Sequence, residues 1–166
     1  MASDPHGGLR ALLPRLYAFA RTMLGDSDAA RDLVQEAAMR ALAARRVPDD
    51  PPAYRAWMFQ IVRNAALDEL RRSRQRAADN HHPIDLWRFD EARIAKITVT
   101  QALAVLAPLH REIISLIDIA GFSYGETADL LKVPVGTVMS RIARARGALL
   151  AVVESSSVRP LKSRHG

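Results

Sequence analysis

The 166-residue sequence contains no cysteine. This absence excludes disulfide bonds, thiol catalysis and zinc sites built from cysteine. Aromatic residues are also scarce, at 5% of the chain, whereas apolar residues reach 49%. Alanine, leucine and arginine dominate, so the chain can form packed cores and favours helices over sheets.

Long hydrophobic runs are missing as well. No stretch of about 20 apolar residues occurs, so we expect no membrane-spanning helix. The first residues, Met1 to Leu9, lack the basic start and the apolar centre of a secretion signal. We therefore expect a soluble, cytoplasmic protein.

Residue patterns typical of catalysis or metal binding are also absent. The sequence has no glycine-rich phosphate loop, no nucleophile and base at a usable spacing, and no carboxylate cluster. Of the five histidines, only His81 and His82 are neighbours, and adjacent residues on a helix do not share a face. We expect no enzymatic activity, no metal and no cofactor.

Basic residues give the chain a net charge of +6, and they are concentrated at a few positions. The densest group lies between Arg71 and Arg76. This distribution suits local contacts with phosphate groups better than a broad polycationic surface.

Apolar residues recur at helical spacing through the first half of the chain. One helix is predicted at Leu9–Leu24, and a second runs from the break and N-cap at Gly25–Asp28 up to Arg46. Three prolines predict a stiff loop at Val47–Pro52. A long helix follows over Ala53–Arg76, with Trp57 expected on its core-facing side.

A helix-turn-helix pattern occupies the second half. Ser123 is placed to cap a short helix, with Glu126 three residues later as in a capping box. Pro134 then starts another helix over Val135–Arg146. Two apolar side chains of that helix, Val138 and Ile142, are expected to face inward. Its outer face carries donors suited to phosphates and base edges. The alternative is an ordinary helical hairpin with a solvated basic face.

The predicted fold is all-α, with two small helical domains joined by a flexible linker. Before the helix-turn-helix, the second domain contains a helix over Thr100–Leu106 and an apolar stripe that includes Leu109 and ends at Gly121. The predicted boundaries are an N-terminal tail at 1–8, a first domain at 9–79, a linker at 80–97 with a short helix at 86–94, a second domain at 98–154, and a disordered tail at 155–166.

Two stretches of the first domain, Asp32–Glu36 and Trp57–Arg72, resemble conserved region two of extracytoplasmic-function (ECF) sigma factors of the sigma-70 family. The stretch Leu106–Arg146 is similar to their region four. The matches follow the family's order along the chain. The resemblance implies a transcription initiation factor that binds RNA polymerase core and promoter DNA, and that is stress-responsive.

The resemblance also implies contacts for the first domain. In the family, a region-two helix docks on the clamp helices of the polymerase β′ subunit, and the β subunit is also contacted. The implied core-binding residues are Asp32, Gln35, Glu36 and Arg40. These charges could instead only solvate a helix face.

A loop of region two holds a flipped base of the −10 element in this family, and the following helix supplies further contacts. The implied −10 residues are Pro48, Asp49, Asp50, Arg63, Asn64, Arg71, Arg72 and Arg74. The arginine cluster could also complement the dipole at the end of its helix.

For the −35 element, the resemblance assigns base reading to Ser140, Ala143 and Arg144. Backbone contacts are assigned to Thr137, Arg141 and Arg146. Met139 departs from the lysine or arginine common at its position, which puts the −35 sequence preference in doubt.

Two other functions remain open at this point. The chain could be a sigma-like mimic that binds an anti-sigma factor, or a stand-alone helix-turn-helix regulator that binds duplex DNA as a dimer. A further expectation from the family is a cognate anti-sigma factor that wedges between the two domains.

Overall fold

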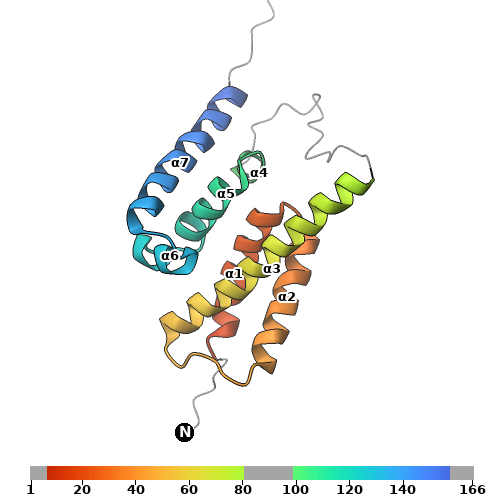
Figure 1. Cartoon of the computed structure of the whole chain (residues 1–166), viewed down its shortest axis with the longest axis vertical. Coiled ribbons are helices and arrows are strands. Elements are labelled where there is room, and N and C mark those ends of the chain that lie inside the picture. Colours follow the sequence, from red (N-terminus) through yellow and green to blue (C-terminus); the bar gives the residue numbers. More distant parts are fainter. Residues whose placement is uncertain (1–6, 81–98, 158–166) are drawn as a thin grey trace, which may run out of the picture.

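The computed structural model describes residues 7–80 and 99–157, and within those ranges every regular element is a helix (Figure 1). The predicted all-α fold is confirmed. No helix in the same ranges is both long and apolar enough to cross a membrane. The elements are α1 Leu9–Leu24, α2 Ser27–Ala43, α3 Pro51–Asp79, α4 Val99–Ala104, α5 Pro108–Ile114, the π-helical segment η1 Ser115–Ile119, α6 Tyr124–Leu131 and α7 Val135–Ser157.

A tight turn joins α1 to α2. Gly25 has a φ of 74°, in the left-handed region that favours glycine, and its N–H donates to the carbonyl of Arg21. The Asp26 carboxylate accepts the N–H groups of Asp28 and Ala29, each at 2.8 Å. The predicted break is therefore confirmed, with Asp26 as the capping residue. α2 ends at Ala43, three residues before the predicted end.

The prediction of a loop through Pro52 was wrong at its end. Pro51 and Pro52 form the first turn of α3, where their missing N–H groups would have no partner within the helix. The Asp50 carboxylate caps this turn by accepting the N–H of Ala53 at 3.0 Å. The loop between α2 and α3 is therefore shorter than predicted, and its last residue, Asp50, caps α3.

Helices α1, α2 and α3 pack around a core of large side chains. Leu16, Phe19, Met58 and Phe59 are fully buried, and the rings of Phe19 and Phe59 meet edge to face with centroids 5.6 Å apart. Trp57, expected on the core-facing side, is half-buried and packs against this core. The fully packed side of α3 consists instead of Tyr54, Met58, Phe59, Val62 and Ala66.

The second unit contains α4 to α7, with a core that includes Ile113, Val138 and Ile142. Leu109, predicted as part of this core, is 60% exposed because it lies in the first turn of α5, on the outer side. The α5 helix continues directly into η1, which ends before Gly121 with its φ of 77°. The predicted stop at Gly121 is confirmed.

Some predicted boundaries differ from the structure or lie outside it. Helix α7 continues to Ser157, so residues 155–157, predicted as disordered tail, are helical. The predicted short helix at 86–94 and nearly all of the linker lie outside the described residues, as do most of the N-terminal tail and the end of the chain.

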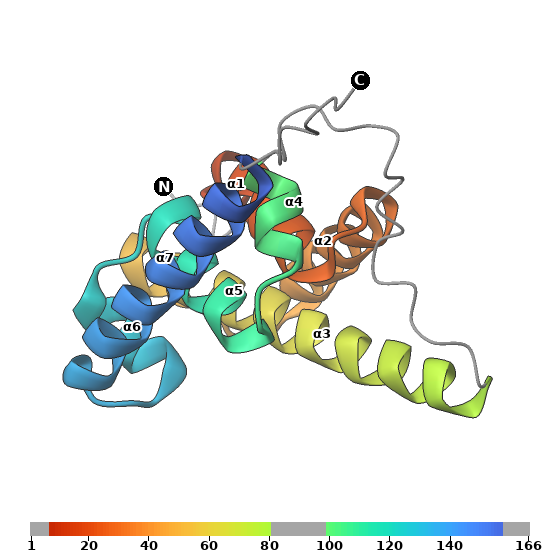
Figure 2. The ribbon, with the colours of Figure 1, turned by 90° about the horizontal axis from the view of Figure 1, so that it is seen from above.

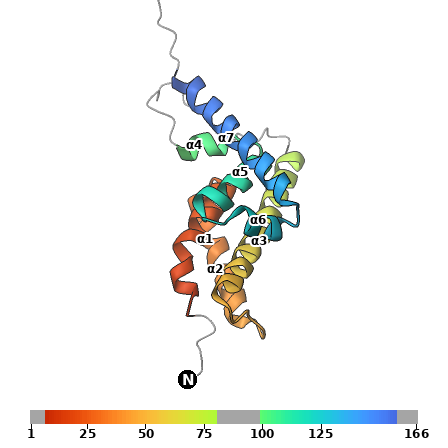
Figure 3. The same ribbon diagram turned by 90° about the vertical axis from the view of Figure 1, so that its left-hand side faces the viewer.

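The two helical units lie directly against each other. α1 contacts α4, α5 and η1, while α3 contacts α6. Figures 2 and 3 show the same arrangement from two further directions, with α5 beside α1. Leu116, Ala120, Phe122 and Leu130 of the second unit join the hydrophobic core of the first. The sequence did not predict this packing.

We predict that Phe59→Ala lowers the free energy of unfolding by about 3–5 kcal/mol, because Phe59 is fully buried between rings of both units. Urea denaturation followed by circular dichroism would measure the loss. Leu42→Ala, at a position 56% exposed, is the control and should change stability by less than about 0.5 kcal/mol. A loss below about 1 kcal/mol for Phe59→Ala would contradict the packing described above.

Candidate nucleic-acid and polymerase interfaces

The outer face of α2 carries the four predicted core-binding residues, Asp32, Gln35, Glu36 and Arg40, and all are exposed. Leu33 and Ala37, on the opposite face, are buried in the core. Glu36 and Arg40 form an ion pair one turn apart. The structure thus places the four polar groups on one solvent-facing side of a firmly packed helix.

Apolar side chains accompany these polar groups, and the sequence analysis missed them. Met39 is 64% exposed on α2. A groove of about 540 Å³ runs between α1 and α2, and the predicted core-binding residue Gln35 is part of its lining. The other lining residues are Leu13, Pro14, Tyr17, Arg31, Val34 and Ala38. The predicted polymerase-binding face is therefore partly apolar, as the centres of protein interfaces usually are.

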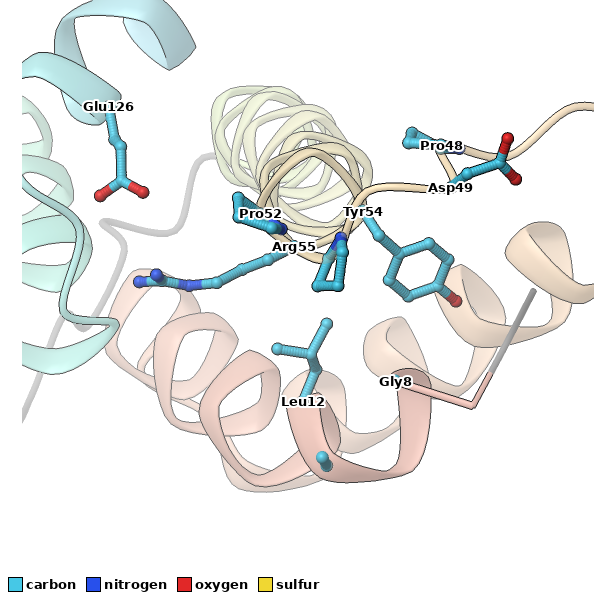
Figure 4. A pocket seen from close by; sticks show the side chains of 10 residues that line it. Gly8, Leu12, Pro48, Asp49, Pro52, Tyr54, Arg55 and Glu126 are labelled. Atoms are coloured by element: carbon cyan, nitrogen blue, oxygen red, sulfur yellow. The ribbon is translucent and has the colours of Figure 1, made fainter. Parts of the chain in front are cut away.

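The loop before α3 borders a cavity of about 580 Å³ (Figure 4). Pro48 and Asp49 line it from the loop, and Tyr54 and Arg55 line it from α3. Figure 4 also shows Glu126 of α6 at this cavity, across from Arg55. Two of the three predicted loop contacts thus face a cavity, while Asp50 has its carboxylate engaged in the helix cap.

The two predicted contacts in the middle of α3 differ in accessibility. Asn64 is exposed, and its side-chain oxygen accepts a hydrogen bond from Gln60 at 3.1 Å. Arg63 instead forms an ion pair with Glu112 of α5, with 2.5 Å between Nε and Oε1. The Arg63 side chain is only 19% exposed. In this structure the Arg63 guanidinium is therefore paired with a carboxylate and largely covered.

The predicted arginine cluster at the end of α3 is exposed. Arg71 pairs with Asp68, while Arg72 and Arg76 pair with Glu69. The hydrogen bond from Arg76 is the largest cause that lowers the pKa of Glu69; it acts with the hydrogen bond from Arg72 against the opposing effect of burial. Such surface pairs are weak, so a phosphate can replace the carboxylate.

The helix-turn-helix consists of α6 and α7. The predicted capping box is present, since the Ser123 hydroxyl accepts the N–H of Glu126 at 3.1 Å and the Glu126 carboxylate accepts the N–H of Ser123 at 2.8 Å. Val138 and Ile142 are buried as predicted. The packing therefore leaves the opposite side of α7 free to contact DNA.

The predicted −35 residues lie along that outer side of α7. Ser140, Ala143 and Arg144 are exposed, and Thr137 and Arg141 are half-buried beside them. The Ser140 hydroxyl donates to the carbonyl of Thr137, which fixes its direction. Met139, the residue that departs from the family pattern, is 53% exposed on the same helix.

Within residues 7–80 and 99–157, Arg146 differs from the other predicted −35 residues in having a carboxylate partner. Its guanidinium contacts both oxygens of Asp118 in η1, at 2.6 and 3.2 Å. The hydrogen bond to Asp118 raises the pKa of Arg146. Arg146 thus joins α7 to η1, and the sequence analysis gave no indication of this role.

The −10 group is spread along α3, whereas the −35 group is compact. Asp50 and Arg74 are separated by about 36 Å of helix, at about 1.5 Å per residue. The residues that sequence reasoning missed, Arg55 and Glu112, touch partners 65 and 49 residues away, so no local pattern could reveal them.

Comparison with known families matches both halves of the chain. Residues 9–76 match Sigma-70 region 2, and residues 96–149 match Sigma-70 region 4. The ECF RNA polymerase sigma factor EcfG of Rhodopseudomonas palustris is 34% identical over 148 residues, covering 86% of this chain and 81% of that protein. The chain belongs to the ECF sigma factors of the sigma-70 family.

Other similar sigma factors are the probable RNA polymerase sigma-C factor of Mycobacterium bovis and SigL of Mycobacterium tuberculosis. The sigma-C factor is 36% identical, and the match covers 79% of this chain and 74% of that protein. SigL is 33% identical, and the match covers 86% of this chain and 85% of SigL. Among solved structures, the sigma factor RpoE of Bartonella quintana in complex with the anti-sigma factor NepR has a TM-score of 0.67 and 30% identity. That match covers 88% of this chain and 94% of RpoE. CnrH in complex with the cytosolic domain of CnrY has a TM-score of 0.65 and 30% identity, and the match covers 89% of this chain and 85% of the CnrH chain.

As an ECF sigma factor, this protein acts with RNA polymerase and promoter DNA in transcription initiation. The family matches confirm the two-domain organisation predicted from the sequence. The roles of individual residues stay predictions, to which the structure adds the exposure and the partners of each side chain.

The capping box of this sigma factor generates a prediction about pH. The hydrogen bond from the Ser123 backbone lowers the pKa of Glu126 in the folded protein. The resulting stabilisation is present above the ordinary glutamate pKa of about 4.3, and it is lost as the pH falls through the lower folded-state value.

Glu126→Gln should therefore lower the free energy of unfolding by roughly 0.3–1 kcal/mol at pH 7, and the difference from wild type should shrink in acid. Chemical denaturation of both proteins across the acid range would measure this. Asp129→Asn removes the same charge from the same helix without touching the cap, and serves as the control. An equal difference at every pH would count against the role of the Glu126 charge.

Proposed function

We propose that this sigma factor docks on the β′ clamp helices through the outer face of α2, holds the −10 strand along the loop and α3, and reads −35 duplex DNA with α7. The observation that carries the proposal is the presence of both kinds of surface on one chain. The exposed polar face of α2 is backed by buried Leu33 and Ala37, and α7 exposes Ser140 and Arg144.

The geometry of α3 supports the proposed −10 contacts. The cavity beside Pro48 and Tyr54 has room for an unstacked base, and apolar rings and prolines favour such a base over water. Asn64 is exposed further along the helix, and its amide can donate and accept. The exposed arginines after Leu70 would bind the phosphates of the same strand.

The mechanism is positional. One domain binds polymerase and the opened −10 strand, the other binds the −35 duplex, and the segment between them sets their separation. We propose that the protein is not itself an enzyme, and that the chemistry of RNA synthesis belongs to the polymerase. We also propose that it acts in the cytoplasm, where its polymerase partner is.

We propose regulation by a cognate anti-sigma factor. Support comes from the two solved structures, in which similar proteins are bound to NepR and to the cytosolic domain of CnrY. Because the two helical units of this chain pack directly together, a protein that wedges between them would have to separate them first. A stress signal would act by releasing that inhibitor.

Two alternatives predict different behaviour. A sigma-like mimic would bind an anti-sigma factor and not core polymerase. A stand-alone regulator would bind duplex DNA tightly without polymerase, usually as a dimer. A mimic would not need the exposed DNA-contacting side chains Ser140 and Arg144. A stand-alone regulator would not need the exposed polar face of α2 for polymerase binding.

In vitro transcription with core RNA polymerase on a genomic template library, with start sites mapped, tests the proposal. We expect specific start sites that share −10 and −35 sequences. The double variant Asp32→Ala, Gln35→Ala should bind core roughly tenfold more weakly, while Asp129→Ala, at an exposed position of α6, is the control. Absence of both core binding and specific initiation would overturn the proposal, and tight duplex binding without core would favour the stand-alone regulator.

Met139 provides a second prediction. Met139→Lys adds a cation to the exposed face of α7, so DNA binding by the polymerase complex should depend more steeply on salt, by about one unit of the log–log slope. Met139→Leu is the control because it keeps the side chain apolar and similar in size. Filter binding at several salt concentrations would measure both slopes. Equal slopes would place Met139 away from the phosphates.

A further inference from the structure

Arg146 links three elements of the helix-turn-helix unit. Its guanidinium contacts both carboxylate oxygens of Asp118 in η1, at 2.6 and 3.2 Å. The hydrogen bond to Asp118 is the largest cause that raises the pKa of Arg146, and a hydrogen bond with the side chain of Tyr124 acts in the same direction. Tyr124 is the first residue of α6. One side chain of α7 therefore engages both η1 and α6.

The position of Arg146 on α7 differs from that of the base-reading residues. At about 100° per residue, Arg146 lies about 40° around the helix from buried Ile142 and about 120° from exposed Ser140. Arg144, by contrast, lies about 40° from Ser140 on the outer side. Arg146 therefore projects from the edge of the packed face of α7, where its side chain reaches Asp118.

The carboxylate partner comes from a π-helical turn. The N–H of Ala120 donates to the carbonyl of Ser115, five residues earlier, at 2.9 Å. Such a turn holds more residues than a turn of α-helix, so its side chains leave the axis in other directions, and π-helical turns are frequent at functional sites. Ser115 and Leu116 are buried, while Asp118 is exposed and reaches Arg146. The turn is thus anchored in the core and presents its carboxylate to α7.

The geometry of this pair suits orientation more than stability. The Arg146 and Asp118 side chains are 49% and 38% exposed, and ion pairs open to solvent add little to the stability of the fold. A guanidinium held by both oxygens of one carboxylate nevertheless has a defined direction. The family resemblance assigns Arg146 to the DNA backbone, but a phosphate there would have to displace Asp118 from both hydrogen bonds.

We propose that Arg146 and Asp118 are positioning residues: the pair fixes the direction of α7 relative to η1, and thereby places Ser140 and Arg144 for reading −35 bases. The inference rests on the proposed function, in which α7 reads the −35 duplex. Neither member of the pair contacts DNA in this role. Because hydrogen bonds to base edges tolerate little displacement, a change in the direction of α7 lowers discrimination between sequences.

The sign of the effect separates this role from simple electrostatics. Loss of a carboxylate from a DNA-binding unit ordinarily tightens DNA binding, because repulsion of the phosphates falls. Asp118→Asn is instead expected to weaken recognition of the −35 sequence, because it releases Arg146 from its fixed direction.

The test uses the complex of core polymerase with the full chain, and two promoter duplexes chosen from the mapped start sites. One duplex keeps its −35 sequence, and the other has that sequence scrambled. Filter binding gives both dissociation constants, and their ratio measures −35 discrimination. Partial unfolding of a variant weakens binding to both duplexes alike, so a purely structural role would leave the ratio unchanged.

We expect Asp118→Asn and Arg146→Gln each to lower the ratio by about fivefold or more, as for the loss of one good base contact. The double variant should lose no more than the larger single loss, because the two side chains act as a pair. Asp129→Asn removes a carboxylate from an exposed position of α6 and, as the control, should leave the ratio unchanged. An unchanged ratio for Asp118→Asn, or losses that add in the double variant, would overturn the proposal.

The salt dependence of binding separates positioning from a phosphate contact. Arg141→Gln removes a predicted backbone contact, so it should lower the log–log salt slope by about one unit. Arg146→Gln should change the slope by less than about half a unit, because Asp118 already neutralises its charge. A fall of about one unit for Arg146→Gln would overturn the proposal in favour of a direct DNA contact.

Failure of the proposed function looks different from failure of the positioning role. Without −35 reading by α7, the wild-type complex would bind the two duplexes equally. Without the positioning role, the wild-type complex would discriminate between them, and Asp118→Asn would discriminate equally well.

Discussion

The ring of Phe59 links the two helical units, because it packs against Phe19 of α1 and against Phe122 of the second unit. Helices as short as α5 or α6 are marginal alone and depend on burial of their apolar faces. Phe122, Leu116 and Leu130 obtain that burial from the first unit. The two units therefore support each other, and any change in their separation must replace these contacts with contacts to DNA, polymerase or water.

That dependence gives the chain two competing demands. In the proposed function the region-2 and region-4 surfaces must lie apart, so that one meets the −10 strand and the other the −35 duplex. The isolated chain instead gains stability by packing them together. Groups such as Arg63, which a phosphate or a carboxylate can satisfy about equally well, allow the same side chain to serve both arrangements. By contrast, the outer faces of α2 and α7 remain exposed in the packed arrangement.

Local sequence patterns predicted many features correctly. Helical spacing of apolar residues located α1, α3 and α7, the Ser123 and Glu126 pair predicted a real capping box, and Val138 and Ile142 are buried as expected. Errors arose at element ends. Proline can start a helix as readily as interrupt one, which explains Pro51 and Pro52, and Leu109 lies in a first turn whose outer side is open to solvent.

The residues alone were sufficient for the all-α class, the two units and the faces of α2 and α7 that remain exposed, because helix caps and periodicity act between residues only a few positions apart. Only the tertiary structure showed which side chains from distant parts of the sequence pair with each other. Arg63 has the same local pattern whether it faces solvent or Glu112, and Arg146 gives no sign of Asp118, since those carboxylates come from distant segments. Long-range packing alone brings such charges together, and it therefore settles which arginines are free to bind DNA.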